Sequence, residues 1–496
     1  MNHDAANTVR AKTVTQLTLF LCGFSLALLN FILVHPIAVA FRDIELALVM
    51  FTLAYFSGLS LGYGLSDRLT PNAIKRYLPV LLLLQCALMI VMQPLAYVIA
   101  QNVAELSAPA SKTLGTSVAY ASVFVLLLCG GTSLFAVFLP QLIDSRTLDL
   151  KRAYSIEVLG SLAGLLAILA LGSLSYQVVL TVYFAAFLIL CATLGLARTG
   201  LAALALMSAA FLFSFDRLDK YFSGWFYRQW YASSGVREVE ETQYTPYHKI
   251  EVLRLNDDKF MLLLNGQRQF TEGSHHTYSY YLAEYPARLL GAPTTLILGC
   301  GSMSTLGRIG SFVPRVKIVD LDERVCAVSQ KYFQEFNHSR DLKNWDLQAD
   351  DAKHFLGNSQ ERFGLILHDI PPARTRQTAL TYTREFFLLV KERVGPGGLF
   401  SIASLNSLDP KQRYGKKMLA TLASVFDRYF VILYRGSAYF YGGDHRFAPP
   451  DKATLFNAID HGGKQAARVL TQADVEAIVK GVGVITVNNV GELIYD

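Results

Sequence analysis

The stretch TTLILGCGSMSTLGRIG, residues 294–310, decides the fold of the C-terminal half. It has the pattern of a buried apolar strand, a glycine-rich turn and the start of a helix, which is the opening of a nucleotide-binding βαβ unit. Gly299 and Gly301 allow the backbone to turn sharply and to approach a ligand closely. Because a lone GxG has little specificity, the interpretation depends on the strands that follow it.

Further strands follow at the spacing of a parallel α/β sheet. VKIVDLDE places Asp320 at the end of the second strand, where an acidic side chain binds ribose hydroxyls. WDLQADDAKHFL ends the third strand in Asp350 and Asp351, FGLILHDIPP ends the fourth in His368 and Asp369, and GPGGLFSIAS supplies the fifth. Parallel strands end at one edge of a sheet, so these acids are expected to line the ligand crevice of a Rossmann-like domain. The alternative is that they only cap helices.

The N-terminal half has a different composition. The 496 residues are 52% hydrophobic and 17% charged, against about 25% charged for an ordinary soluble domain, and the apolar excess is confined to residues 1–215. The formal net charge is +6 and no basic run interleaved with aromatic residues is present, which argues against a nucleic-acid partner. Cys300 and Cys326 have neither disulfide-framework nor CxxC spacing, so we expect the soluble part in a reducing compartment.

Six apolar runs are long enough to cross a bilayer, which requires about 20 residues. A shorter seventh run extends from Leu201 to Phe215. It is compatible with a membrane span, a re-entrant segment or an interfacial helix. Gly160 and Gly164 form a GxxxG motif, which allows helices to approach closely. The first run exceeds the length of a signal-peptide core, so we expect it to be retained. The six long runs cover residues 14–34, 45–64, 77–100, 117–143, 154–174 and 177–197.

Lysine and arginine are concentrated on one side of these runs. The N-terminus and the connections on its side carry nine of them, against four on the other side if the seventh run crosses. The positive-inside rule then predicts a multi-pass protein of the inner (cytoplasmic) membrane with a cytoplasmic N-terminus. Nucleotide chemistry in the C-terminal half requires the same compartment, so we expect that one run, the seventh, does not cross.

Between the two halves the pattern changes twice. Residues 216–240 mix aromatic and basic side chains, which is typical of an amphipathic segment at a membrane interface. From Lys249 onward, KIEVLRL and KFMLLL predict strands joined by a turn, and a helix is expected over residues 278–290. The predicted fold is therefore a transmembrane α-helical bundle (1–215), an interfacial linker (216–240), a small β-hairpin subdomain (241–292), a Rossmann-like α/β domain (293–450) and a tail without a readable role (451–496).

From about residue 245 to 403 the chain resembles the spermidine synthase (polyamine aminopropyltransferase) family. The motifs that carry the resemblance occur in family order: TPYHKIEV, LNGQRQ, LILGCGSMSTL, VDLDERV, ADDAKHFL, LILHD, YTREFF and GPGG. The multi-span N-terminus resembles the membrane-bound branch of that family. The resemblance implies an enzyme that binds S-adenosylmethionine, or its decarboxylated form, as a substrate and releases 5'-methylthioadenosine without a further cofactor.

The resemblance also implies roles for single residues. Asp369 matches the catalytic aspartate, and Tyr278 matches the tyrosine of the family's Y-H-E segment. Gln269 and Asp320 match residues that contact the nucleoside and its ribose, and Asp351 matches the acid that accepts the adenine amino group. The other residues expected to bind the nucleoside substrate are His248, Gly299, Gly301, Ser302 and Asp350.

Several family positions hold a different residue here, and most of the lost residues are acids. A diamine acceptor is a dication, and binding it in a partly dry cleft requires opposing carboxylates. In addition, the loss of the acid after the glycines removes a charge that would repel the carboxylate of intact S-adenosylmethionine. The altered positions are Ser274, His275, Tyr280, Ser302 and Pro372, with His248 in place of a glutamine.

These departures favour an intramolecular lyase, in which the substrate's own carboxylate attacks its γ-carbon and closes homoserine lactone. The alternative is aminopropyl transfer from decarboxylated S-adenosylmethionine, with Asp369 orienting or deprotonating the amine. A second alternative is a sensor that binds the nucleoside without turnover. The β-hairpins and LNGQRQ argue against methyl transfer. No metal site is expected, because His275 and His276 lack an acid or cysteine at ligand spacing. The expected partners are a small nucleoside substrate and the lipid bilayer, and the sequence does not decide whether the chain forms a homo-oligomer.

Overall fold

The computed structural model divides the chain into two compact units. Unit 1 comprises Met1–Lys259 and Leu263–Arg268, and unit 2 comprises Phe260–Leu262 and Gln269–Asp496. The fourth apolar run, 117–143, lies outside the described residues except for residue 136. The structure describes residues 2–41, 44–66, 68, 70–106, 136, 149–171, 175–273, 276–291, 293–373, 375–404, 413–434, 436–451 and 467–493.

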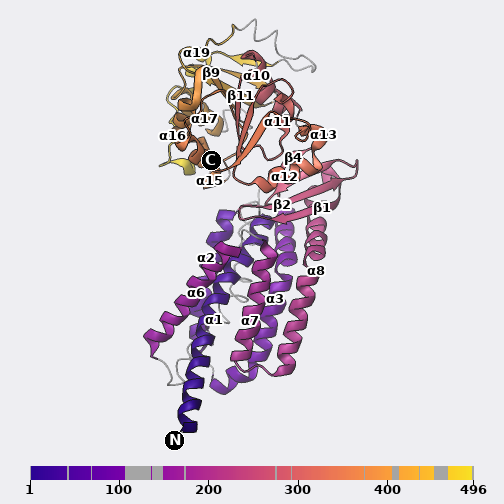
Figure 1. The fold of residues 1–496 in the computed structure, drawn as a ribbon, viewed down its shortest axis with the longest axis vertical. Helices are drawn as coiled ribbons and strands as arrows, with labels where there is room; N and C mark the ends of the chain where they lie inside the picture. The colour runs from indigo at the N-terminus through magenta and orange to yellow at the C-terminus, as the bar shows by residue number, and fades with distance from the viewer. Residues whose placement is uncertain are drawn as a thin grey trace. The chain divides into compact units, whose positions relative to one another are not determined.

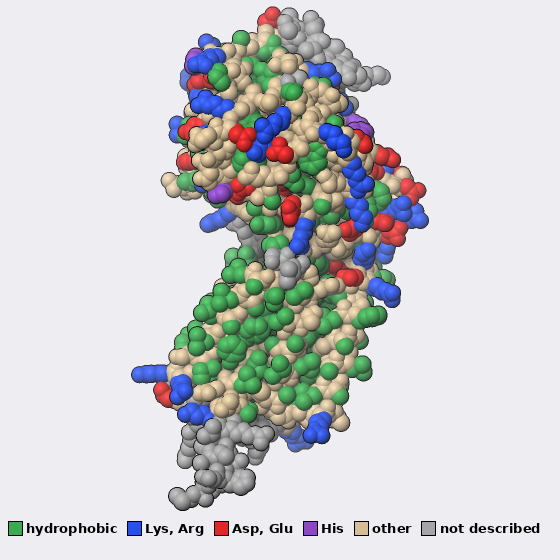
Figure 2. All heavy atoms as spheres, viewed as in Figure 1, with side chains coloured by type: hydrophobic (Ala, Val, Ile, Leu, Met, Phe, Trp, Pro, Cys, Tyr) green, Lys and Arg blue, Asp and Glu red, His purple; other side chains and the backbone are tan. Residues whose placement is uncertain are grey.

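Unit 1 contains a set of long helices (Figure 1). Within the described ranges, six helices are long and apolar enough to cross a membrane. Their outward side chains are apolar too: Leu169, Leu206 and Phe213 are 77%, 73% and 86% exposed, and Figure 2 shows hydrophobic side chains covering this helical region. Contiguous exposed apolar surface of this kind marks a membrane or protein interaction site. The helices are α1 (Asn2–Phe41), α2 (Ile44–Ser66), α3 (Pro71–Leu106), α6 (Leu150–Leu171), α7 (Tyr176–Thr193) and α8 (Arg198–Trp230).

Helix α8 is longer than the apolar pattern indicated. It continues from Arg198 to Trp230 without interruption, through the seventh apolar run and into the segment expected to form a linker. Because α8 is among the described helices that are long and apolar enough to cross a membrane, its length does not support the expectation that the seventh run stays on one side. After a single 3-10 turn, Ala232–Ser234, strand β1 (Val236–Tyr244) begins. The aromatic and basic residues up to Trp230 therefore extend a helix, and residues 236–240 already belong to a strand.

The GxxxG motif allows close packing between α6 and α1, as the sequence predicted. A Cβ atom added to Gly160 would lie 2.0 Å from the carbonyl oxygen of Phe20, and one added to Gly164 would lie 2.8 Å from that of Phe24. On the opposing helix, a Cβ on Gly23 would lie 2.0 Å from a backbone oxygen of α6. Because the conflicts are with backbone atoms, a larger side chain must push the two helices apart.

Replacing Gly160 by Val should destabilise the protein by about 1–3 kcal/mol, the usual effect of overpacking a tight contact. The measurement is the thermal unfolding of the purified protein in lipid nanodiscs. Gly64→Val on α2 is the matched control, since a Cβ at Gly64 would meet nothing within 4 Å. Equal unfolding temperatures for the two variants would show that α1 and α6 are not in backbone contact.

A four-stranded sheet has the order β1-β2-β3-β4, with β2 at Lys249–Leu255, β3 at Phe260–Leu264 and β4 at Gln267–Thr271. The strands predicted from KIEVLRL and KFMLLL are thus present. Asn265 and Gly266, which join β3 to β4, both have positive φ, 48° and 72°. This conformation is the one that a two-residue hairpin turn requires, and the Asn-Gly pair adopts it readily.

Unit 2 contains an eight-stranded mixed sheet of order β12-β10-β11-β9-β8-β5-β6-β7. The five strands predicted to be parallel, β9, β8, β5, β6 and β7, do pair parallel to one another, with one register shift between β8 and β9. An antiparallel extension of β11, β10 and β12, which the sequence did not reveal, completes the sheet. The strands are β5 (Thr295–Leu298), β6 (Val316–Asp320), β7 (Trp345–Ala349), β8 (Phe363–His368), β9 (Val394–Ser404), β10 (Arg428–Tyr434), β11 (Ser437–Gly443) and β12 (Arg468–Leu470).

Helices cover both faces of this sheet. Leu296 and Leu298 of β5 are buried in one apolar core, and Ile297 between them is buried in the other. This explains the continuous apolar run in the sequence, since a strand covered on both faces has no polar side to alternate with. The principal helical segments are α9 (His276–Ser279), η3 (Tyr280–Glu284), α10 (Tyr285–Leu289), α11 (Ser304–Ile309), α12 (Glu323–Tyr332), α13 (Gln334–Asn337), α14 (Ala352–Asn358), α15 (Arg376–Ala379), α16 (Arg384–Arg393), α17 (Arg413–Ala423) and α19 (Gln472–Val479).

Candidate active site

The glycine-rich turn after β5 contacts the end of β8. Gly299 has a φ of +75°, and a Cβ atom there would lie 2.7 Å from the carbonyl oxygen of Asp369. Only glycine combines this left-handed backbone with so close an approach. The backbone amide of Asp369 donates to the carbonyl oxygen of Leu298 at 2.8 Å. Gly299 therefore fixes the position of Asp369 at the carboxyl edge of the sheet, which is where α/β sheets bind ligands.

Asp369 accepts hydrogen bonds from two hydroxyl groups on different helices. Tyr278 of α9 donates from Oη to Oδ1 at 2.8 Å, and Thr305 of α11 donates from Oγ1 to Oδ2 at 2.5 Å. The structure thus brings the two predicted catalytic residues together. It adds Thr305, which sequence reasoning missed because one threonine in a glycine- and serine-rich turn has no distinguishing pattern.

The surroundings of Asp369 place its titration near neutrality. Burial raises the pKa of this carboxyl group to about 6, although the hydrogen bonds from Thr305 and Tyr278 oppose the change. Burial, together with the charge of Asp369, raises the pKa of Tyr278 well above its ordinary value. Tyr278 therefore remains a hydrogen-bond donor, and Asp369 can accept a proton from a substrate at neutral pH, as a general base must.

His368, which directly precedes Asp369, has a packing role. The ring is buried, and its Nε2 lies 3.1 Å from the carbonyl oxygen of Thr381. The rings of Tyr382 and Phe386 contact it edge-on. Burial lowers the pKa of His368 to about 4, so it is neutral at physiological pH and packs as an uncharged ring behind the carboxylate.

The acids at the ends of β6 and β7 lie where the sequence placed them, and each accepts a hydrogen bond from a residue close to it in the chain. Asp320 Oδ1 accepts the backbone amide of Asp322 at 2.9 Å. Asp351 Oδ1 caps α14 by accepting two backbone amides, at 2.9 and 3.0 Å, so the helix-capping alternative describes part of its role. Asp350 Oδ1 lies 2.8 Å from Nδ1 of His354. Their roles in nucleoside binding remain predictions.

Neutral hydroxyl groups occupy the position where the family has an acid after the glycines. Ser302 Oγ and Ser304 Oγ share a hydrogen bond of 2.9 Å, and Ser304 Oγ shares another, of 3.3 Å, with Ser279. Gly301 accepts a hydrogen bond at its carbonyl oxygen from Ser329, at 2.5 Å. The glycine-rich turn therefore presents hydroxyl groups near α9 in place of a carboxylate.

The other predicted positions are distributed between the two units. In unit 1, His248 donates its backbone N–H to Thr245 Oγ1 at 2.9 Å in the turn before β2. In unit 2, Gln269 lies half-buried on β4, and the ring of Tyr280 lies 5.7 Å from the guanidinium carbon of Arg308. Ser274 and His275 lie outside the described residues. Across the part of the chain that the structure describes, no three His, Cys, Asp or Glu side chains are grouped to hold a metal ion.

The C-terminal half is similar in sequence to known proteins. Residues 275–436 match the family model described as "Spermine/spermidine synthase domain". The polyamine aminopropyltransferase of Aeropyrum pernix is 28% identical over 187 residues, which cover 36% of this chain and 59% of the relative. The enzyme of the same name from Saccharolobus solfataricus is 25% identical over 169 residues, covering 33% of this chain and 56% of the relative. The chain thus spans a little over half the length of these relatives.

The solved structures give a weaker likeness. A probable spermidine synthase from Corynebacterium glutamicum superposes with a TM-score of 0.40 at 20% identity, covering 51% of this chain and 96% of that chain. The match of residues 275–436 to the family model shows that the C-terminal half contains a region similar to the spermine/spermidine synthase domain, as the sequence motifs implied. The relatives' printed names favour the aminopropyl-transfer alternative over the lyase reaction that the sequence departures favoured.

Proposed function

We propose that this chain is a membrane-bound enzyme that transfers an aminopropyl group from decarboxylated S-adenosylmethionine to an amine, releasing 5'-methylthioadenosine. The observation that carries the proposal is Asp369, held by Tyr278 and Thr305 at the carboxyl edge of the sheet. In the reaction the amine nitrogen attacks the carbon next to the sulfonium sulfur, the carbon–sulfur bond breaks, and its electron pair stays on sulfur. The nitrogen then carries a proton in excess, which Asp369 accepts.

The rest of the molecule is assigned supporting roles in this proposal. Gln269, Asp320 and Asp351 bind the nucleoside of the donor, in agreement with the family motifs they match. The apolar helices of unit 1 anchor the enzyme in the cytoplasmic membrane, with the catalytic half in the cytoplasm. S-adenosylmethionine or its decarboxylated form acts as a substrate, and the chemistry requires no further cofactor.

Acceptor dependence tests the proposal. The full-length protein, purified in nanodiscs, is incubated with decarboxylated S-adenosylmethionine, with and without putrescine or a longer polyamine, and 5'-methylthioadenosine is quantified by liquid chromatography. We expect its release to depend on the amine. Release that is equal without any amine would contradict transfer, and tight binding without release would show that the domain is a sensor.

A lyase acting on intact S-adenosylmethionine is the second candidate, and Ser302 favours it. The family's carboxylate at this position is replaced by a hydroxyl bonded to Ser304, so nothing negative at residue 302 opposes the carboxylate of the intact donor. In this reaction that carboxylate attacks the γ-carbon, the carbon–sulfur bond breaks, and homoserine lactone and methylthioadenosine form.

Ser302→Asp should therefore discriminate between the two donors. Two like charges at about 4 Å repel each other by roughly 4 kcal/mol at intermediate dielectric, so turnover of intact S-adenosylmethionine should fall at least tenfold relative to the decarboxylated donor. Ser302→Asn, which is of similar size and uncharged, is the control. An unchanged ratio of kcat/KM for the two donors would place residue 302 away from the carboxylate.

The pH profile should report Asp369. A general base must be ionised, and the pKa of Asp369 is raised to about 6, so kcat/KM should rise with pH through about 6 and then level off. Tyr278→Phe removes a hydrogen bond that stabilises the ionised form, so this limb should move to higher pH. Tyr332→Phe on α12, whose ring packs against Phe260, is the control. A profile without a limb in this range would exclude Asp369 as the base.

A further inference from the structure

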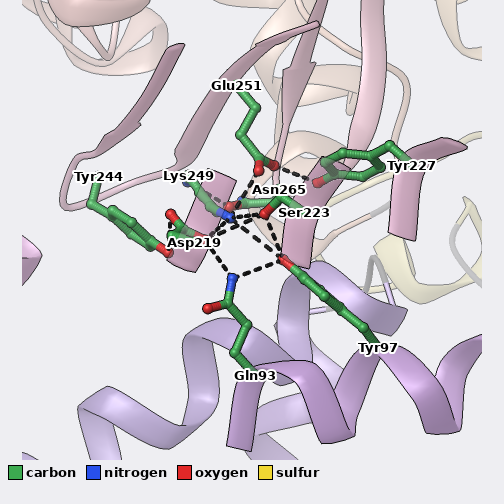
Figure 3. A network of polar contacts seen from close by, with 9 residues as sticks. All are labelled: Gln93, Tyr97, Asp219, Ser223, Tyr227, Tyr244, Lys249, Glu251 and Asn265. Atoms are coloured by element: carbon green, nitrogen blue, oxygen red, sulfur yellow. Dashed lines mark hydrogen bonds and ion pairs between the residues drawn. The ribbon is translucent and has the colours of Figure 1, made fainter. Parts of the chain in front are cut away.

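Unit 1 contains a buried ionic cluster that the proposed reaction does not use (Figure 3). Lys249, the first residue of β2, has Nζ 2.7 Å from Oδ1 of Asp219 on α8 and 2.8 Å from Oε1 of Glu251 on β2. The three side chains are at most 1% exposed. The same ammonium group donates to Ser223 Oγ at 2.8 Å and to Tyr97 Oη of α3 at 3.4 Å. One lysine thus links strand β2 to helices α3 and α8.

The formal charges of this cluster do not cancel. Lys249 supplies one positive charge, and Asp219 and Glu251 supply two negative charges if both are ionised. A buried charge without compensation is strongly unfavourable. The other side chains bonded to these two carboxylates in the described part of the chain are uncharged, namely Gln93, Ser223, Tyr227 and Tyr244. The cluster therefore needs one further positive charge.

Other titratable groups packed around the cluster do not supply it through a bond to either carboxylate. His35 of α1 and Tyr176 of α7 have ring centroids 6.3 and 4.4 Å from that of Tyr244 on β1. His35 Nδ1 is instead bonded to the carbonyl oxygen of Phe31 at 3.0 Å, and Tyr176 donates to that of Ile32 at 3.0 Å. Within the cluster, the excess negative charge can therefore be removed by a proton on Asp219 or Glu251.

The two acids differ in how many donors they face. Asp219 accepts hydrogen bonds from four side chains, three at Oδ1 and one at Oδ2 (Figure 3). Glu251 accepts one, at Oε2 from Tyr227. At Oε1, Glu251 faces the ammonium group of Lys249 at 2.8 Å, so it faces two donors where Asp219 faces four. Donors favour the ionised form of a carboxyl group, so the added proton belongs on Glu251.

We propose that Glu251 holds an additional proton, which makes the Lys249 cluster electroneutral and keeps strands β1 and β2 packed on helices α3 and α8, so that loss of this proton at higher pH weakens the packing. The inference concerns unit 1 alone and does not depend on the proposed reaction. It makes the membrane helices and the first strands one proton-dependent structural unit, where the apolar sequence indicated only an anchor.

The direction of the pH effect follows from the titration of Glu251. Burial, with the charge of Asp219 in addition, raises the pKa of Glu251 above the ordinary value of 4.5, although Lys249 lowers it in part. A group whose pKa is raised by folding stabilises the folded state in its protonated form. That stabilisation is fully present below pH 4.5, the ordinary pKa of a glutamate, and is lost as the pH rises through the raised pKa of Glu251.

Infrared spectroscopy of the full-length protein in nanodiscs tests the proposal. The carbonyl stretch of a protonated carboxylic acid is recorded over a pH titration in an Asp369→Asn background, which removes the carboxyl group that titrates near 6. The otherwise wild-type protein is compared with Glu251→Gln and with the control Glu238→Gln, whose side chain on β1 is 51% exposed. We expect a band that persists above pH 4.5 in the otherwise wild-type protein and the control and is missing in Glu251→Gln. The proposal is overturned if the band of the otherwise wild-type protein disappears at or below pH 4.5, or if Glu251→Gln leaves the band above pH 4.5 unchanged.

Thermal unfolding provides a second readout that does not depend on assigning a band. The wild-type unfolding temperature should fall as the pH rises through the titration of Glu251. In Glu251→Gln, whose amide is always neutral and can still accept from Tyr227, this part of the pH dependence should be missing. Identical pH dependence in the two proteins would contradict a proton on Glu251, and the wild-type infrared titration decides the matter if the variant does not fold.

Discussion

Replacing Asp369 by Asn should lower kcat/KM for methylthioadenosine release by about 10²- to 10⁴-fold, the usual contribution of a general base. Asparagine has nearly the same shape, but its single amide oxygen can accept only one of the hydrogen bonds from Tyr278 and Thr305, which now bind the two carboxylate oxygens at 2.8 and 2.5 Å. It cannot take up the amine's proton. The measurement is steady-state kinetics of the purified full-length protein.

Two controls separate this effect from damage to the site. Asp369→Asn should bind 5'-methylthioadenosine with nearly wild-type affinity in calorimetry, because the nucleoside contacts are assigned to other residues. Asp346→Asn on β7, where the carboxylate is 49% exposed, should retain full activity. Activity of Asp369→Asn within a few-fold of the wild type would remove this residue from the catalytic step.

Replacing Lys249 by Met should lower the free energy of unfolding by about 3–5 kcal/mol, because it leaves a buried carboxylate without its counter-charge. Asp219 lies 2.7 Å from the ammonium group and has no other cation bonded to it within the described residues. The measurement is denaturant or thermal unfolding in nanodiscs. Lys259→Met, at a side chain 48% exposed, should have little effect, since exposed ion pairs contribute about 0–1 kcal/mol.

The double variant Lys249→Met with Asp219→Asn identifies the cause. Asp219→Asn removes the carboxylate that Lys249→Met leaves without a counter-charge, so it should recover a substantial part of the lost stability. Such non-additivity of the two substitutions is not expected for independent sites. If Lys249→Met alone is as stable as the wild type, the cluster is not ionic in the folded protein. If the double variant is less stable than the single one, packing rather than charge explains the loss.

The parallel part of the sheet could be predicted because its information is local. Each strand is an apolar run buried on both faces, as Leu296, Ile297 and Leu298 illustrate, and each ends in an acid or a glycine-rich turn. Family motifs predicted Asp369 and Tyr278 as the catalytic residues, and the structure brings them within 2.8 Å of each other. Gly299 lets the turn after β5 pass the backbone of Asp369.

The features that sequence reasoning missed depend on partners distant in the chain. KIEVLRL has the alternation of a strand with one polar face, yet Lys249 and Glu251 on that face are fully buried, because Asp219 lies 30 residues earlier and pairs with the lysine. Thr305 binds Asp369 across 64 residues. The end of α8 was misjudged because aromatic and basic residues suit both an interfacial linker and the last turns of a helix.

The central claim is aminopropyl transfer, and a competition between donors tests it most directly. The wild-type protein is incubated with equal concentrations of intact and decarboxylated S-adenosylmethionine and an excess of putrescine, and all products are identified by mass spectrometry. We expect methylthioadenosine and aminopropylated amine in equal amounts, with both missing in Asp369→Asn. Methylthioadenosine accompanied by homoserine lactone in equal amount, without an aminopropylated amine, would contradict the account.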